Sequence, residues 1–192
     1  MTTIAVVKKA GRIAIAADTL TKWGPAKESA DYIVNHSKIL RVRDSYLAIT
    51  GSTTFKLILA DYFAQPRVQA DFNSPAAIFR TWQRLHAALK ERYFLQPEED
   101  KEDALESSRL DVLIANPRGI FGVAAQRTVQ EYARFYAFGS GADLALGAMY
   151  SIYAARGRSA EDIARHAIET AAEFDDGTGL PVQSHSLRQR AS

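Results

Sequence analysis

The chain has no cysteine among its 192 residues. A disulfide framework, a cysteine nucleophile and thiolate metal ligands are therefore excluded. Neither sign of charge is in large excess, because 24 basic and 22 acidic residues leave a net charge of +2. This balance gives no support for nucleic acid or a membrane surface as a partner. We expect a cytoplasmic protein, since there is no signal-peptide layout and no apolar run approaches the roughly 20 residues of a membrane span.

Motifs for metals and nucleotides are also missing. No glycine pattern suits a phosphate-binding loop. The histidines lack any paired ligand spacing of the His-Glu-x-x-His kind; they are His36, His86, His166 and His185. We therefore expect no metal and no cofactor, and any ATP-driven step would need another chain.

The hydrophobic pattern predicts one compact domain over residues 1–192. Runs of β-branched and alternating residues predict strands at Thr2–Val7, Arg12–Ala17, Lys38–Arg43, Tyr46–Thr50, Leu110–Ala115 and Ile120–Ala125. Apolar spacing and capping residues predict helices after Thr53, from Ser74-Pro75, over Ala142–Ala155 and from Ser159 to about Phe174. A short terminal strand follows. This order favours an α+β fold, a four-layer αββα sandwich with two antiparallel sheets between two helical layers.

Three segments carry no such pattern. Thr19–Ser37 is expected to be irregular around Trp23-Gly24-Pro25, and a turn is expected at Asp44-Ser45. The acidic stretch Pro97–Glu106 is interpreted as a solvated loop, with a docking surface as the alternative.

The second residue offers a specific chemistry. Thr2 follows Met1, and a small residue at this position allows the initiator methionine to be removed. Removal would leave a threonine whose hydroxyl is a nucleophile and whose free amine is a base that can activate it. The first hairpin would place Thr2 and Asp18 at the same end of the sheet.

Such a nucleophile needs three aids. A cation lowers the pKa of the amine, a partly buried cation needs an anion, and a backbone N–H must meet the developing oxyanion. An Asp18–Lys38 pair beside Thr2 and the N–H of Gly51 would supply them. From the residues alone, Asp18 as a turn residue and Lys38 as a surface cation are the simpler alternatives.

Several stretches, in order along the whole chain, resemble a proteasome β-type subunit of the N-terminal-nucleophile hydrolase superfamily. They are Thr2-Thr3-Ile4, Gly11, Ala17-Asp18, Lys38 before Ile-Leu, Ala48-Ile49-Thr50-Gly51, Gly139-Ser140-Gly141 and Asp175-x-x-Thr178-Gly179. The short length and the Met-Thr start are similar to the bacterial forms, HslV and the bacterial proteasome homologues. The Asp175 and Thr178 element favours the latter group, because HslV lacks it.

The resemblance assigns a role to individual residues. Thr2 would be the nucleophile and base, Lys38 would tune its amine with Asp18 as partner, and Gly51 would supply the oxyanion N–H. The residues that would orient the amine are Ser140, Asp175 and Thr178, where threonine replaces serine but keeps the hydroxyl. Thr21, Lys22 and Thr53 would flank the peptide, and Ile49, Thr53 and His36 would border the specificity pocket. For His36, an exposed loop imidazole is the preferred alternative.

The implied function is a threonine-type peptidase that cleaves peptides or unfolded proteins. The resemblance implies homo-oligomeric stacked rings, with two heptamers favoured over two hexamers and with a separate ATPase unfoldase as a partner. A non-catalytic ring or scaffold subunit is the alternative, and it would follow if Met1 stayed in place. An amidase that acts on a small substrate is a third reading.

Overall fold

A four-stranded antiparallel sheet carries the start of the chain. The computed structural model describes residues 2–96 and 104–190. In this sheet β1 (Thr3–Lys9) and β2 (Arg12–Ala17) form the expected hairpin, and the strand order is β10-β1-β2-β11, with β10 at Phe135–Gly139 and β11 at Gln183–Arg188. Strand β1 is therefore paired on both sides, and its first five residues are buried.

The second sheet has five antiparallel strands in the order β5-β6-β7-β8-β9. Its strands are β5 (Ile39–Val42), β6 (Ser45–Ile49), β7 (Val112–Asn116), β8 (Gly119–Val123) and β9 (Val129–Tyr132). Strands β7 and β8 are buried along their whole length, as expected for strands covered on both faces.

Four helices cover the outer faces of the two sheets. They are α1 (Thr54–Ala64), α2 (Pro75–Arg92), α3 (Ala142–Ile152) and α4 (Ala160–Phe174). Two of the expected N-caps are confirmed. The Ser74 hydroxyl accepts a hydrogen bond from Ala77 N, and Ser159 forms a reciprocal capping box with Asp162.

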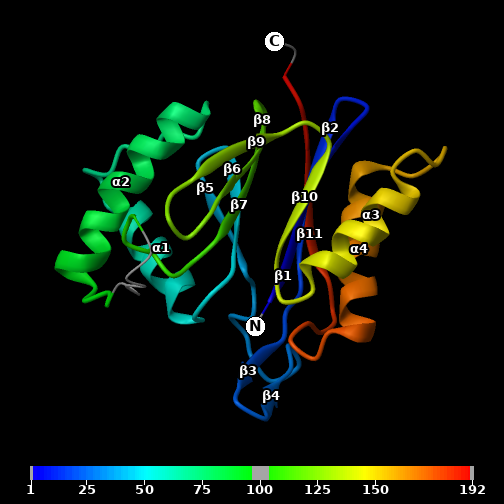
Figure 1. The fold of residues 1–192 in the computed structure, drawn as a ribbon, viewed down its shortest axis with the longest axis horizontal. Coiled ribbons are helices and arrows are strands. Elements are labelled where there is room, and N and C mark those ends of the chain that lie inside the picture. Colours follow the sequence, from blue (N-terminus) through cyan, green and yellow to red (C-terminus); the bar gives the residue numbers. More distant parts are fainter. Residues whose placement is uncertain (1, 97–103, 191–192) are drawn as a thin grey trace.

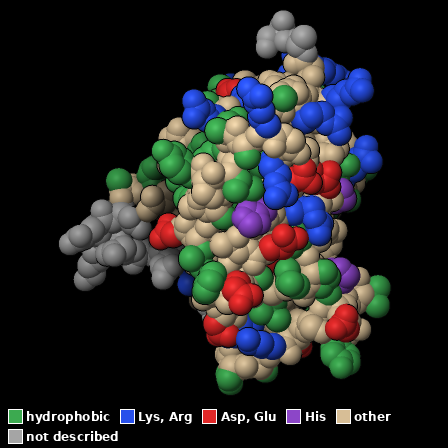
Figure 2. Space-filling view, turned by 90° about the vertical axis from the view of Figure 1, so that its right-hand side faces the viewer, with side chains coloured by type: hydrophobic (Ala, Val, Ile, Leu, Met, Phe, Trp, Pro, Cys, Tyr) green, Lys and Arg blue, Asp and Glu red, His purple; other side chains and the backbone are tan. Residues whose placement is uncertain are grey.

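Three apolar clusters show how the layers pack. One lies between α1, α2 and the five-stranded sheet, a second between α3, α4 and the four-stranded sheet, and a third between the sheets themselves. Fully buried Ile4, Ile15 and Leu113 belong to the middle cluster. The four-layer αββα sandwich is thus confirmed, and Figure 1 shows the layers edge-on. Figure 2 shows acidic and basic side chains interspersed over the face that α3 and α4 cover.

The prediction for Thr19–Ser37 is partly wrong. This segment contains a small hairpin, β3 (Thr21–Trp23) and β4 (Ala26–Glu28), turned at Gly24 with a φ of +58°. Each strand has only three residues, and β4 is exposed throughout, so neither gives a hydrophobic pattern. Figure 1 shows the hairpin projecting from the sandwich at the end where the N-terminus lies.

Three smaller differences from the predictions concern one turn, one strand and the end of one helix. The turn expected at Asp44-Ser45 lies one residue earlier, because Ser45 pairs with Val42 and Arg43 takes a φ of +57°. Strand β9 was not predicted, and the third helix ends at Ile152 rather than Ala155. Of the acidic stretch, Pro97–Asp103 lies outside the described residues.

Candidate active site

The backbone of Thr2 is fixed by the segment that follows β10. Its carbonyl oxygen accepts a hydrogen bond of 2.9 Å from Ser140 N. The neighbouring Gly139 has a φ of +106°, and a Cβ added there would stand 1.8 Å from the Thr2 carbonyl oxygen. Only glycine allows this approach of the two chain segments. Thr2 is thereby held directly before the central strand β1.

The two adjacent threonines occupy different environments. Thr3 is fully buried, and its Oγ1 accepts a hydrogen bond from Gly141 N at 3.0 Å and lies 2.5 Å from Thr178 Oγ1. Thr2 instead lines a pocket. Successive strand residues face opposite sides, so only one of the two hydroxyls can face a substrate. The hydroxyl on the pocket side is that of Thr2.

Asp18 and Lys38 form the predicted ion pair. Lys38 Nζ lies 2.7 Å from Asp18 Oδ1, and the exposed fractions of the two side chains are 11% and 0%. Asp18 Oδ1 also accepts from Thr3 N, while its Oδ2 accepts from Leu20 N and Gly179 N, all at 3.1 Å. The surface-cation alternative for Lys38 is wrong, because its side chain is mostly buried. Asp18 does make the local contact of a turn residue, with Leu20 N, but its carboxylate also binds Thr3, Lys38 and Gly179 in the interior.

Burial governs the electrostatics of this pair. It raises the pKa of Asp18 and lowers the pKa of Lys38, because each charged form loses hydration. Their mutual attraction and the N–H donors from Thr3 and Gly179 oppose these shifts. A lysine with a lowered pKa that lines the same pocket as Thr2 marks this pocket as a candidate functional site.

The Ser140, Asp175 and Thr178 side chains form one hydrogen-bonded group. Ser140 Oγ and Thr178 Oγ1 both donate to Asp175 Oδ2, at 2.6 and 2.5 Å. Since Thr178 has only one hydroxyl proton, the Thr3 hydroxyl donates to Thr178. Burial raises the pKa of Asp175, but these donors and Gly177 N outweigh it and hold the pKa below its usual value. The group therefore presents an ionised carboxylate next to the segment that holds Thr2.

One pocket, of about 100 Å³, brings most of the predicted residues together. Thr2, Lys38 and Gly51 line it, as do the predicted substrate contacts Thr21, Lys22, Ile49 and Thr53. Its other lining residues are Leu20, Trp23, Ser52 and Lys56. The volume suits one side chain, since pockets for drug-sized ligands are roughly 300 Å³ or more.

Gly51, which lines the pocket, has a backbone conformation and a close neighbour that require glycine. Its φ is +98°, and a Cβ added there would stand 2.8 Å from the Arg109 carbonyl oxygen. A residue with a side chain would strain the backbone and collide with the neighbouring segment.

His36 is placed outside the lining of this pocket. It lies in the loop before β5, half-buried, and its Nδ1 is 2.8 Å from the Ile33 carbonyl oxygen. This position supports the loop-residue alternative over the specificity-pocket prediction, although the imidazole is half-buried rather than exposed.

Lys56 was not predicted as a site residue. It lies on α1, three residues after Thr53, and residues three apart on a helix share a face. This three-residue spacing from Thr53 is the sequence signal that could have identified Lys56 as a pocket residue.

A second polar cluster resembles a catalytic triad but is closed. His86 Nδ1 lies 2.9 Å from Ser108 Oγ, and His86 Nε2 lies 3.0 Å from Glu106 Oε2. Ser108 is only 1% exposed, so no substrate reaches its hydroxyl. This cluster joins α2 to the segment before β7 and is structural.

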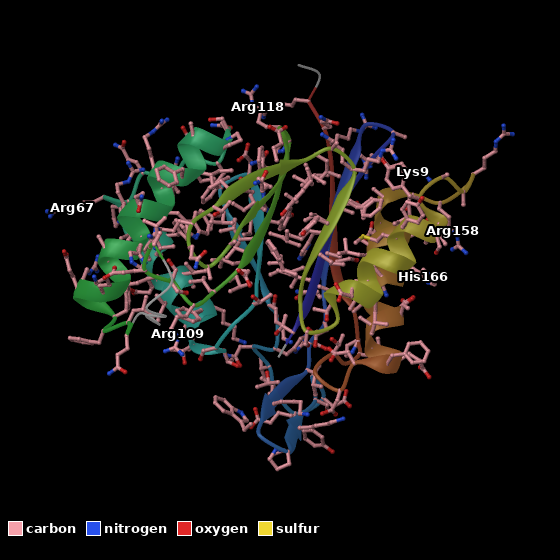
Figure 3. The ribbon with its side chains drawn as sticks, in the orientation of Figure 1. Lys9, Arg67, Arg109, Arg118, Arg158 and His166 are labelled. Atoms are coloured by element: carbon pink, nitrogen blue, oxygen red, sulfur yellow. The ribbon has the colours of Figure 1, made fainter. Side chains whose placement is uncertain are left out.

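Within residues 2–96 and 104–190, no three His, Cys, Asp or Glu side chains are grouped so that they could hold a metal ion. His166, for example, lies exposed on α4 (Figure 3) and belongs to no such group. No helix in the described part of the chain is long and apolar enough to cross a membrane.

Comparison with known proteins identifies relatives among solved structures. The chain is 62% identical to Thiobacillus denitrificans BPH, with a TM-score of 0.95 over 100% of both chains. The same protein in complex with Epoxomicin gives 62% identity and a TM-score of 0.94 over 99% of this chain and 100% of that one. Eukaryotic HslV from Trypanosoma brucei shares the fold at 20% identity, with a TM-score of 0.69 over 98% and 100%. No protein-family model and no curated protein sequence matches.

Proposed function

Because the chain belongs to the bacterial proteasome homologues, a group of proteasome-like N-terminal-nucleophile hydrolases, we propose that it is a threonine peptidase subunit with Thr2 as its nucleophile. One observation carries this proposal. Thr2, Lys38 and Gly51 line the same pocket, and the cation among them is held by a fully buried carboxylate. A nucleophile, a group that tunes its base and a backbone donor are thus assembled in one place.

The first step requires that Met1 is removed, so that Thr2 carries a free amine. The positive charge of Lys38 disfavours a second positive charge nearby and keeps a larger fraction of this amine neutral. The neutral amine takes the hydroxyl proton, and the Thr2 oxygen attacks the peptide carbonyl.

The attack creates an oxyanion, which the N–H of Gly51 stabilises. The protonated amine then gives its proton to the leaving nitrogen, the C–N bond breaks, and an acyl ester remains on Thr2. A water molecule, deprotonated by the same amine, hydrolyses this ester and frees the second product.

The remaining residues hold the parts in place. Ser140, Asp175 and Thr178 orient the amine of Thr2 through the segment that fixes its carbonyl. Thr21, Lys22, Ile49 and Thr53 flank the peptide in the pocket. Asp18 acts through Lys38 and is a positioning residue.

The assembly is also part of the proposal. Subunits form a homo-oligomeric double ring, with two heptamers favoured over two hexamers, and the sites face an internal chamber. A separate ATPase would unfold protein substrates, in the cytoplasm. A relative solved in complex with Epoxomicin, a protease inhibitor, supports the peptidase activity.

The test is the intact mass of the purified protein before and after exposure to epoxomicin. Loss of the Met1 mass and gain of one adduct, absent in Thr2→Ala, are the expected results. Retained Met1 with no adduct would favour the non-catalytic ring subunit instead.

A further inference from the structure

The pocket that contains Thr2 has an unusual charge. Three lysines line it, Lys22, Lys38 and Lys56, whereas none of its lining residues is a carboxylate. Each lysine must be paired or solvated, because an isolated charge near the interior is costly. The partner of each one therefore decides what the pocket can accept.

Two of these lysines have a carboxylate partner outside the lining. Lys38 pairs with the fully buried Asp18. The side chain of Lys22 is 7% exposed and pairs with Asp176, which also lies 2.9 Å from Lys27 Nζ and is 68% exposed. Their charges are thus largely balanced before a substrate arrives.

Lys56 differs from both. Its ammonium donates to the neutral carbonyl oxygen of Asn35. Among residues 2–96 and 104–190 no carboxylate oxygen lies within 4 Å of Lys56 Nζ. Burial lowers the pKa of Lys56, and its charge also contributes to the lowered pKa of Lys38. The pocket therefore holds one positive charge in excess.

The position of Lys56 in the pocket relates its positive charge to one residue of a peptide substrate. A carbonyl attacked by Thr2 lies at the pocket wall, with its oxygen toward Gly51. In the proposed reaction, the side chain on the amino side of the cleaved bond branches from the carbon atom next to this carbonyl, so it would enter the same pocket. Leu20 and Ile49 provide apolar contact for its stem.

Resting on the proposed peptidase function, we propose that Lys56 makes this enzyme prefer an acidic residue, aspartate or glutamate, on the amino side of the cleaved bond. A carboxylate entering the pocket would replace a neutral partner of Lys56 by a charged one, and charge-assisted hydrogen bonds are the stronger kind. A lysine or arginine side chain would be repelled by the excess charge of Lys56, which adds discrimination against basic substrates.

The experiment compares fluorogenic peptides that differ only at this position, with Glu, Gln, Leu or Lys. Glu and Gln have nearly the same shape, so their ratio of kcat/KM reports the charge. We expect wild type to favour Glu over Gln roughly tenfold, the effect of one charge-assisted hydrogen bond. Lys56→Met should bring this ratio near one, Lys56→Arg should keep it, and Lys56→Glu should favour the Lys peptide.

A matched control is Lys9→Met. Lys9 is also half-buried and donates to a backbone carbonyl, that of Ala155 at 2.9 Å. Figure 3 places it at the opposite end of the sandwich from β3 and β4. This variant should keep the wild-type ratio.

The outcomes separate the two proposals. Absence of both peptide hydrolysis and an epoxomicin adduct would overturn the peptidase function itself. Hydrolysis with equal rates for Glu and Gln in wild type would overturn only the acidic preference, without any need for a variant to fold. An equal loss on all four peptides in Lys56→Met would also overturn it, since Lys56 would then only anchor the Asn35 segment.

Discussion

Lys38 Nζ lies 2.7 Å from Asp18 Oδ1, and the Asp18 side chain is completely buried. Breaking a buried pair leaves one charge without compensation, which costs about 3–5 kcal/mol. Lys38→Met should lower the free energy of unfolding by about that amount, as measured with urea, and remove the epoxomicin adduct. Lys38→Arg should recover part of the stability. Wild-type stability in Lys38→Met would contradict this role of the pair.

The lowered pKa of Lys38 predicts the alkaline limb of the activity profile. Protonated Lys38 is the active form, so activity should fall as pH rises through its folded pKa, which burial places below the ordinary lysine value. Lys56 adds to this lowering. In Lys56→Met the limb should therefore move to higher pH, as measured by kcat/KM for the Leu peptide against pH. A limb that moves to lower pH would contradict the assignment.

The adjacent threonines should respond oppositely to substitution. Thr3→Val leaves the buried Gly141 N without its acceptor, which should cost about 1–3 kcal/mol of stability. Thr2→Ala should abolish the adduct, because it removes the proposed nucleophilic hydroxyl. Urea unfolding and intact mass test both variants. A stable Thr3→Val or an adduct on Thr2→Ala would show that the two roles are wrongly assigned.

Gly51→Ala tests the oxyanion donor. The substitution brings a Cβ within 2.8 Å of the Arg109 carbonyl oxygen, so the backbone must shift and carry its N–H away. We expect kcat to fall by about 10²–10³-fold, as for the loss of one oxyanion donor. Gly11→Ala is the control, since Gly11 has a φ of +70° but no atom within 4 Å of an added Cβ. Equal activities for both variants would exclude Gly51 as the donor.

Acid should loosen the contact between the β3–β4 hairpin and the segment after α4. Hydrogen bonds from Lys22 and Lys27 lower the pKa of Asp176 to about 2, from an ordinary value of about 3.9. Because the folded pKa is depressed, this stabilisation is present above about pH 3.9 and is lost as pH falls toward 2. Asp176→Asn should therefore lower Tm at pH 7, and the difference from wild type should shrink as pH falls below about 3.9 and vanish below about pH 2. Salt at about 1 M should reduce it at pH 7 as well. A difference independent of pH would point to packing instead.

Elements with a local signal could be predicted from the sequence. The β1–β2 hairpin has alternating and β-branched residues, and α2 and α4 have serine caps, so each is specified by its own residues. The β3–β4 hairpin is too short and too exposed for such a signal. Its position depends on contacts with other segments, including the Lys22–Asp176 pair.

The candidate site divides in the same way. Asp18 and Lys38 could be placed near Thr2 because each lies at the end of a predicted strand. The role of Thr3 could not be seen, because its partner Thr178 is 175 positions away. The spacing from Thr53 could have placed Lys56 at the pocket. Its lack of a carboxylate partner among the described residues could not be predicted, because that depends on the folded chain.

The hydrogen bond from Gly179 N to Asp18 Oδ2 has a consequence for the timing of activity. The Asp18 carboxylate, which pairs with Lys38, gains its full set of hydrogen bonds only when the segment near residue 179 has been synthesised and has packed against it. The backbone of Thr2 likewise waits for residues 139 and 140. A nascent chain emerging from the ribosome therefore carries its threonine for most of translation without the surroundings that activate it. For the proposed peptidase, the order of synthesis would itself delay hydrolysis until the domain is nearly whole.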